Sequence, residues 1–208
     1  ENLNNRANVL YISPAKALSA DQLTALTSYN LPGLHAASYD GDTPVGERRW
    51  IREHANFILT TPDMLNYSIL SNHRQWASFL RGLRYVVLDE AHSYRGVFGA
   101  HIANLLRRLR RVCALYRTVP VFYGASATSS NPVESFSKLI GVPQQAVTAI
   151  TESTSARGET TVALWEPEFM PPKAHDQLAK GARSPQQQAV QSKAEQEAPR
   201  RVSPVEQG

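Results

Sequence analysis

The sequence predicts an α/β fold in which a mainly parallel sheet is flanked by helices. Two observations indicate this fold. Short β-branched runs alternate with helix-patterned segments over residues 1–169, and prolines stand where helices would follow several of these runs. Because parallel strands need crossover connections, the alternation favours a sheet covered on both faces. A chain of 208 residues, 42% of them hydrophobic, is long enough for one domain with a buried core.

Each predicted element has its own signal. Strand composition is found at residues 8–12, 35–39, 56–60, 85–88, 119–124 and 160–165. Helix starts are predicted at Ser13-Pro14, Thr43-Pro44, Thr61-Pro62 and Asn131-Pro132, because each pair puts a capping side chain before a proline at the first helical position. Asn131 with Glu134 also resembles a capping box.

A longer amphipathic helix is predicted around residues 102–113, where apolar side chains recur at helical spacing. Its other face carries arginines, namely Arg107, Arg108, Arg110 and Arg111. We interpret them as a solvated helix face, with contact to nucleic acid as the alternative.

Several helix starts closely follow a predicted strand. The carboxyl ends of strands form the ligand edge of an open parallel sheet, and helix N-termini there present free N–H groups to anions. The architecture therefore predicts an edge that handles phosphates.

Composition excludes several classes of protein. The net charge of +4 is too small for a strongly basic nucleic-acid binder, so any such binding must come from individually placed groups. A single cysteine, Cys113, excludes an internal disulfide and fits a cytoplasmic protein. No apolar run reaches the roughly 18 residues of a membrane span. Residues 170–208 are rich in Gln, Ala, Pro and Ser, which predicts a flexible linker or tail.

The stretch YVVLDEAH, residues 85–92, carries the most chemistry. In it, a predicted buried strand is followed directly by two adjacent carboxylates, Asp89 and Glu90. A rigid strand tip can hold a carboxylate on Mg²⁺, and a second acid beside it can deprotonate a water that attacks a terminal phosphate. His92 could report the state of a nucleotide to another surface. The alternative is that the two acids only cap a loop.

These residues also carry a family resemblance. VVLDEAH resembles motif II of the superfamily 2 helicases, the DEAD/DEAH-box group. Residues 13–18 (SPAKAL) resemble motif Ia, residues 60–65 (TTPDML) motif Ib, and residues 126–128 (SAT) motif III, all in the family order. The segment SYRGVFGAHIANLLRRLRR, with YDGDTP upstream, further resembles the bacterial YprA/MrfA-type DNA helicases, which carry a DUF1998 region and are linked to DNA repair.

The resemblance implies a RecA-like first lobe that uses ATP and Mg²⁺, grips a DNA strand (RNA is the alternative) and faces a second RecA-like lobe. By position, the catalytic residues would be Asp89, which would hold the metal, Glu90, which would be the hydrolytic base, and His92. Two further residues, Ser126 and Thr128, would join the nucleotide site and link it to strand movement. The implied nucleic-acid contacts are Pro14, Lys16, Gly41, Thr61, Pro62 and Asp63.

One required part is missing from the sequence. The family needs a phosphate loop, Gly-x-x-x-x-Gly-Lys-Ser/Thr, ahead of motif Ia, and no such string occurs here. We therefore expect residues 1–169 to be an N-terminally truncated RecA-like domain that by itself binds ATP weakly and unwinds nothing. The alternatives are a non-catalytic nucleic-acid-binding product or remnant of a helicase gene, and an unrelated α/β hydrolase. The hydrolase is disfavoured because no Gly-x-Ser-x-Gly elbow is present.

Overall fold

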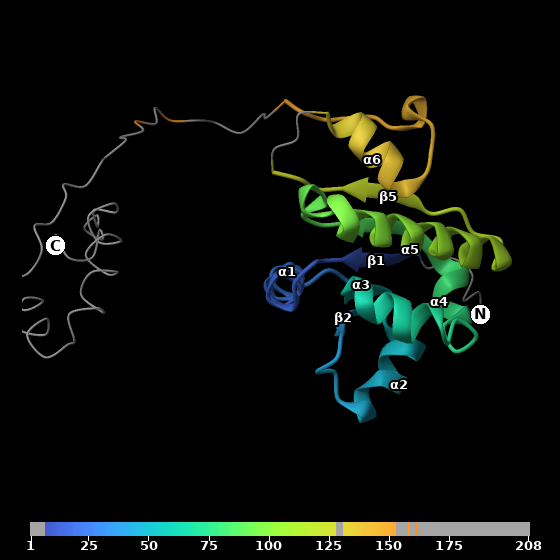
Figure 1. Cartoon of the computed structure of the whole chain (residues 1–208). Helices are drawn as coiled ribbons and strands as arrows, with labels where there is room; N and C mark the ends of the chain where they lie inside the picture. Colours follow the sequence, from blue (N-terminus) through green and yellow to red (C-terminus); the bar gives the residue numbers. More distant parts are fainter. Residues whose placement is uncertain (1–6, 128–130, 153–157, 159–160, 162–208) are drawn as a thin grey trace, which may run out of the picture. The chain divides into compact units, whose positions relative to one another are not determined.

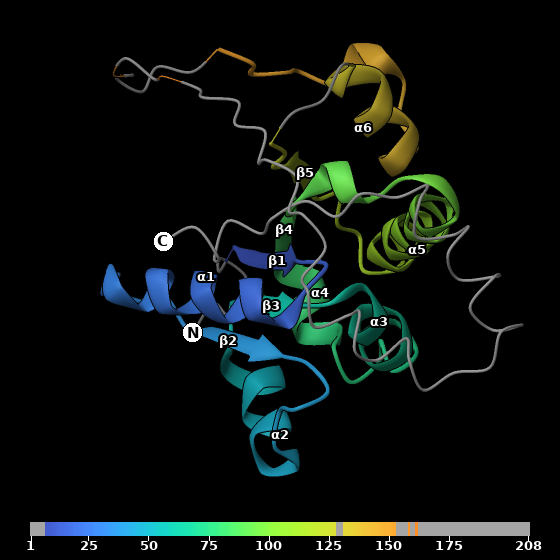
Figure 2. The same ribbon diagram turned by 60° about the vertical axis from the view of Figure 1, so that its left-hand side comes forward.

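A computed structural model describes residues 7–127, 131–152, 158 and 161 of the chain. Figure 1 shows the chain, in which five parallel strands form one sheet in the order β2-β3-β1-β4-β5; Figure 2 labels all five. They are β1 (Asn8–Ile12), β2 (Ala36–Tyr39), β3 (Phe57–Thr60), β4 (Leu83–Leu88) and β5 (Val121–Gly124). The α/β prediction is confirmed. The strand expected at 160–165, apart from Thr161, and the tail expected at 170–208 lie outside the described residues.

Helices connect these parallel strands. They are α1 (Lys16–Ser28), α2 (Val45–His54), α3 (Pro62–Met64), α4 (Ala77–Gly82), α5 (Gly96–Leu115) and α6 (Pro132–Ile140). A π-helical segment, η2 (Leu65–Leu70), continues α3, and two short 3-10 turns are η3 (Ala91–Ser93) and η4 (Gln144–Ala146). Figure 2 shows α1 on one side of the sheet and α3 and α5 on the other. Within the described part of the chain, no helix is both long and apolar enough to cross a bilayer.

The core lies on the face of the sheet that α4, α5 and η2 cover. Leu10, Ile58, Val86 and Leu88 are fully buried on this face, and the strand register puts them side by side. The same cluster contains Leu80 of α4, Ile69 of η2 and three apolar residues of α5, namely Ile102, Leu106 and Leu109. This continuous apolar layer makes the strand ends above it rigid.

The opposite face is covered unevenly, which differs from the expectation of two fully covered faces. Tyr85 of β4 and Val121 and Tyr123 of β5 are 39%, 53% and 53% exposed. The reason is the position of α1, which contacts β2 and β3 at the other end of the sheet.

Two of the four predicted proline-led helix starts are correct. Thr61 accepts a hydrogen bond from the backbone N–H of Met64 at 3.4 Å, and Asn131 accepts one from Glu134 at 3.3 Å. The starts at Ser13-Pro14 and Thr43-Pro44 are wrong, because α1 begins at Lys16 and α2 at Val45, both without a side-chain cap.

Tertiary contacts explain these two errors. The buried Ser13 extends the sheet, since its N–H donates to the carbonyl of Thr60 at 3.0 Å. The hydroxyl of Thr43 faces away from α2, where it accepts a hydrogen bond from the N–H of Asp40 at 2.9 Å. The hydroxyl of Ser13 donates to the carbonyl of Ala15 at 3.2 Å, so both side chains make hydrogen bonds other than a helix cap.

Candidate functional site

The acid pair stands at the carboxyl end of β4, between the ends of β1 and β5. The N–H of Asp89 donates to the carbonyl of Ile12 at 2.9 Å, and the N–H of Ala125 donates to the carbonyl of Leu88 at 2.9 Å. The N–H of Ala91 in turn donates to Ala125 at 2.7 Å. Since both neighbouring strands hold this backbone, the position of the Asp89 carboxylate is set by the sheet.

The backbone orients the Asp89 carboxylate, whose Oδ1 accepts the N–H of Glu90 at 2.9 Å. Burial and then the neighbouring Asp89 carboxylate raise the pKa of Tyr11. A carboxylate held in this way keeps lone pairs available for a cation.

Glu90 has a strained backbone. Its φ of 49° and ψ of 46° lie in the left-handed region, which costs a non-glycine residue about 1 to 3 kcal/mol and is most often found at functional sites. The turn lifts Glu90 out of the strand direction, and its side chain is 38% exposed. The second acid therefore projects from the edge, whereas Asp89 stays in line with the sheet.

His92 lies between this acid and motif III. Its Nδ1 is 3.2 Å from Oε2 of Glu90 and 3.4 Å from the backbone N–H of Ala127. The same nitrogen cannot donate to the carboxylate and accept from the N–H in one protonation state. The histidine can therefore pair with motif II or with motif III, and it can exchange one contact for the other.

Motif III contacts His92 through its backbone. Ala127, between Ser126 and Thr128, supplies the N–H that faces His92, and the side chain of Ser126 is exposed. Thr128 lies outside the described residues.

The segment after the DEAH residues is shaped by two glycines. Gly96 has a φ of 58°, which a side chain would strain, and a Cβ on Gly99 would lie 2.4 Å from the carbonyl oxygen of Tyr94. The close approach folds Tyr94 inward until only 6% of it is exposed, and its hydroxyl has no hydrogen-bond partner. Burial and then the charges of Asp89 and Glu90 raise its pKa.

The candidate nucleic-acid contacts occupy the other half of the same edge. Pro14 follows β1, Gly41 follows β2, and Thr61, Pro62 and Asp63 follow β3. Their strands are neighbours in the order β2-β3-β1. The acids and motif III follow β4 and β5, so the edge is divided between the two sets of residues.

Lys16 and Asp42 form an exposed ion pair on that half of the edge. The Lys16 Nζ lies 2.7 Å from Oδ2 of Asp42, and this hydrogen bond raises the pKa of the lysine. A Cβ built on Gly41 would lie 3.5 Å from the same Nζ, which is an ordinary van der Waals contact, so the ion pair does not require a glycine there. Exposed pairs of this type are weak, and the lysine can leave Asp42 for a phosphate.

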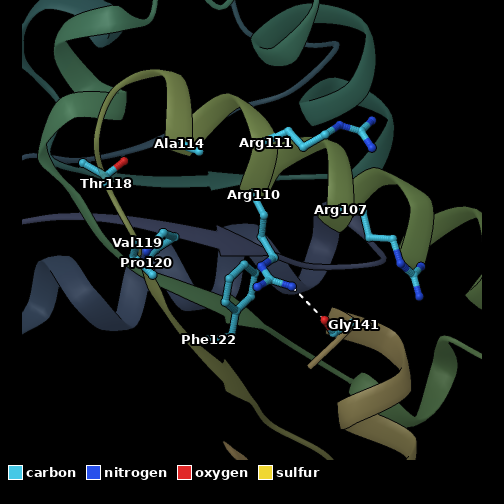
Figure 3. Close-up of a pocket in the computed structure, with 9 residues that line it drawn as sticks. All are labelled: Arg107, Arg110, Arg111, Ala114, Thr118, Val119, Pro120, Phe122 and Gly141. Atoms are coloured by element: carbon cyan, nitrogen blue, oxygen red, sulfur yellow. Dashed lines mark hydrogen bonds between the residues drawn. The ribbon is translucent and has the colours of Figure 1, made fainter. Parts of the chain in front are cut away.

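The arginines of α5 serve the fold. Arg110 donates to the carbonyls of Ile140 and Gly141 at 3.1 and 2.8 Å, and Arg107 donates to Lys138 at 3.4 Å, at the C-terminus of α6. Arg108 donates to Oδ1 of Asn66 at 2.7 Å. Arg107, Arg110 and Arg111 border a cavity of about 500 Å³ beside the start of β5, in which Arg110 points towards Gly141 (Figure 3). Arg107, Arg110 and Arg111 are exposed, as the solvated-face interpretation expected, and Arg107, Arg108 and Arg110 also donate to neighbouring elements.

Sequence reasoning missed Tyr11 and gave Tyr94 no role at the acids. The signal for Tyr11 was available in the strand pattern. Tyr11 pairs with Val87 in the β1–β4 register, and Asp89, two residues further, points to the same face. That inference needs the register, which the sequence does not supply.

Known proteins resemble the chain over most of its length. The model of the DEAD/DEAH box helicase family matches residues 1–136. ATP-dependent helicase YprA of Bacillus subtilis is 44% identical over 146 residues, which are 69% of this chain and 19% of YprA. ATP-dependent helicase HRQ1 of Saccharomyces cerevisiae is 41% identical over 169 residues, 78% of this chain and 16% of HRQ1.

Solved structures agree with these relatives. The DUF1998 helicase MrfA, in a crystal structure with DNA and AMPPNP, is similar with a TM-score of 0.64 and 41% identity over 67% of this chain and 20% of MrfA. The chain therefore spans about a fifth of the length of these relatives. The family match covers more than half of the 208 residues and includes motifs Ia, Ib and II. On this evidence, the chain belongs to the DEAD/DEAH box helicase family.

Proposed function

We propose that this chain is the first RecA-like lobe of an ATP-dependent superfamily 2 DNA helicase, in which ATP hydrolysis drives movement along a DNA strand. The observation that carries the proposal is the position of Asp89 and Glu90. They stand at the edge where β4 ends, beside motif III and in line with the strand ends that carry motifs Ia and Ib.

In this proposal Asp89 holds Mg²⁺ and Glu90 is the general base. The residues fit the metal, because Mg²⁺ takes one or two carboxylates and fills its other positions with water and phosphate oxygens. In residues 7–127 and 131–152 no group of three or more His, Cys, Asp or Glu side chains forms a complete protein cage. The bound metal would neutralise charge on the phosphates.

Glu90 suits the role of base through its geometry. Glu90 stands in the left-handed turn with its side chain 38% exposed, so a water can bind to its carboxylate. His92 contacts this carboxylate and the motif III backbone with one nitrogen. Exchange between the two contacts would couple the state of the nucleotide site to motif III.

The other half of the edge would bind the nucleic-acid backbone. The first N–H groups of α1 have no side-chain cap, and Lys16 stands at its first position, so both can donate to a phosphate. Thr61 already occupies the N–H of Met64, and Asp63 is negatively charged. We therefore assign motif Ib a smaller share of the phosphate contacts. DNA is preferred over RNA because the relative MrfA was solved bound to DNA.

The location that we propose is the cytoplasm or another reducing compartment. The single cysteine, Cys113, is buried, and burial raises the pKa of its thiol to about 11. A thiol of this kind is poorly reactive.

The test uses the full-length gene product, numbered as here. Glu90→Gln should lower the turnover number for ATP by about 10²- to 10⁴-fold while nucleotide binding persists, because only proton transfer is lost. Glu53→Gln is the matched control at an exposed glutamate of α2. Equal hydrolysis by wild type and Glu90→Gln would exclude the assigned base. The 208-residue chain itself should show no ATPase activity, because it contains no phosphate loop.

A further inference from the structure

The cavity beside the start of β5 has a charged side and an apolar side (Figure 3). The charged side is formed by Arg107, Arg110 and Arg111 of α5, and the apolar side by Val119, Pro120 and Phe122. Its volume of about 500 Å³ is within the range of cavities that hold small organic ligands. None of the described residues that line it is acidic. The cavity therefore suits a ligand that has both an anionic group and an apolar group.

Arg110 is fixed at this cavity by the end of α6. Its Nη1 donates to the carbonyls of Ile140 and Gly141 at 3.1 and 2.8 Å. Its Nε and Nη2 have no hydrogen bond to another described residue, so these N–H groups remain available to a ligand. Because the guanidinium already has a fixed position, a ligand can bind without first ordering this long side chain.

Arg107 and Arg111 lie one helical turn apart and are held more weakly. Nη2 of Arg107 has a long contact of 3.4 Å to the carbonyl of Lys138. A Cβ on Gly141 would lie 3.2 Å from Nε of Arg107, so a side chain there would crowd the guanidinium. Arg111 is exposed and has neither a hydrogen bond nor an ion pair to any described residue. Contact with the end of α6 thus accounts for Arg110, but it gives Arg111 no structural role.

The charge around this cavity is unbalanced. Residues 91–133 contain six arginines and neither aspartate nor glutamate. The glutamate of α6, Glu134, is paired with Lys138. Like charges four residues apart on a helix are destabilising, so an anion beside Arg107 and Arg111 would relieve their repulsion.

The two sides of the cavity match the two parts of a nucleotide. Guanidinium groups bind phosphate through paired N–H donors, and aromatic side chains stack with bases. We propose that this cavity binds a nucleotide unit, with its phosphate on the arginines and its base against the apolar side. A free nucleotide and one unit of a single strand share this chemistry. An acidic protein segment would use the arginines alone, so the aromatic ring favours the nucleotide.

This site is separate from the edge that carries the acids. It lies at the start of β5, whereas the backbone of Ala125, just after the end of β5, contacts Ala91 beside the acid pair. The inference therefore goes beyond the proposed function and does not depend on the roles of Asp89 and Glu90.

The test uses the full-length protein with a saturating, non-hydrolysable ATP analogue, which occupies the nucleotide edge. Thymidine 5′-monophosphate is titrated by equilibrium dialysis, and a fluorescent oligothymidylate by anisotropy at several salt concentrations. If the ligand is a free nucleotide, Arg111→Gln should lower the affinity for the monophosphate about tenfold, because charge-assisted hydrogen bonds are lost. If it is a strand, the slope of log affinity for the oligothymidylate against log salt concentration should become about one unit less steep.

Arg49→Gln is the matched control, because it removes the same charge from an 81% exposed side chain of α2. It should leave the binding of both probes unchanged. The thermal midpoint of Arg111→Gln should equal that of the wild type, since Arg111 has no partner among the described residues. An equal midpoint separates loss of the ligand contact from loss of the fold.

Phe122→Leu tests the apolar side, because it keeps an apolar side chain and removes the ring. It should weaken the nucleotide probe that responds to Arg111→Gln by about fivefold or more. Inorganic phosphate, measured by competition, should bind this variant and the wild type equally well. If Phe122→Leu weakens neither ligand, or both equally, the assignment of the base is overturned.

The probes also decide the inference as a whole. A change caused by Arg111→Gln in either nucleotide probe, which Arg49→Gln does not reproduce, supports the inference, and the probe that responds identifies the source. Unchanged binding of both probes overturns it. Affinity for a fluorescent oligoglutamate that depends on Arg111, with both nucleotide probes unchanged, would also overturn it and assign the cavity to an acidic protein segment.

Discussion

Replacing Gly99 by alanine tests whether the turn after the acids is held by close backbone packing. A Cβ at this position would lie 2.4 Å from the carbonyl oxygen of Tyr94 and 2.7 Å from its carbonyl carbon. Real Cβ contacts stay above 3.0 Å, so the two backbone segments must separate by more than half an ångström. Both atoms belong to the backbone, and no flexible side chain can yield instead.

Two terms of opposite sign determine the magnitude. Alanine is favoured over glycine inside a helix by up to about 1 kcal/mol, whereas forcing extra volume into a packed site costs about 1 to 3 kcal/mol. We therefore expect a net loss of about 1 to 2 kcal/mol in the free energy of unfolding. Gly46, near the start of α2, is the matched control, because a Cβ there meets nothing within 4 Å.

The assay is urea denaturation of the purified chain, with tryptophan fluorescence as the signal of unfolding. Trp76 is buried in the core and reports the transition. Gly46→Ala should be neutral or stabilising, and Gly99→Ala should move the midpoint to lower urea. If Gly99→Ala were as stable as Gly46→Ala, the packing argument for the turn, and with it the fixed position of Tyr94, would be refuted.

Three more outcomes follow from the same structure. Leu88→Ala removes a fully buried side chain at the base of the acid turn and should lower the free energy of unfolding by about 3 to 5 kcal/mol, measured by urea denaturation. Lys16→Ala in the full-length protein should weaken the salt dependence of single-strand binding. In a plot of log affinity against log salt concentration, the slope should become about one unit less steep. An unchanged slope would mean that Lys16 does not contact a phosphate. Because burial raises the Cys113 pKa from 9.0 to about 11, the unfolded thiol ionises first, and stability should fall as pH rises through this window. In denaturation measured at several pH values, Cys113→Ala should make the free energy of unfolding fall less steeply with pH. An equally steep fall would show that the Cys113 thiol does not cause it.

Strand positions were predictable because their signal is local. The runs that became β1, β3 and β5 contain the observed strands to within two residues at either end. Their β-branched composition favours extended backbone, and the crossover helices between them require parallel pairing. The position of Asp89 and Glu90 after β4 followed from the same pattern, as did the caps at Thr61 and Asn131.

Helix starts at Ser13 and Thr43 were not predictable in this way. Both side chains are of a type that caps helices, but other contacts hold these residues. The backbone N–H of Ser13 donates to the carbonyl of Thr60, and the hydroxyl of Thr43 accepts from the N–H of Asp40. The arginines of α5 show a similar limit. Their helical spacing predicted an exposed face, but it could not predict that Arg110 also donates to the carbonyls of Ile140 and Gly141 at the end of α6.

The sequence by itself determined the alternation of strands and helices, the motifs at the strand ends and the family to which they belong. Tertiary structure alone decided that Tyr11 lies beside the end of the strand that carries Asp89, that Glu90 takes a left-handed turn, and that His92 lies between two motifs. The physical reason is range. Composition and spacing act over a few neighbouring residues, whereas strand register and the packing of α5 bring together side chains more than 70 positions apart, as with Tyr11 and Asp89.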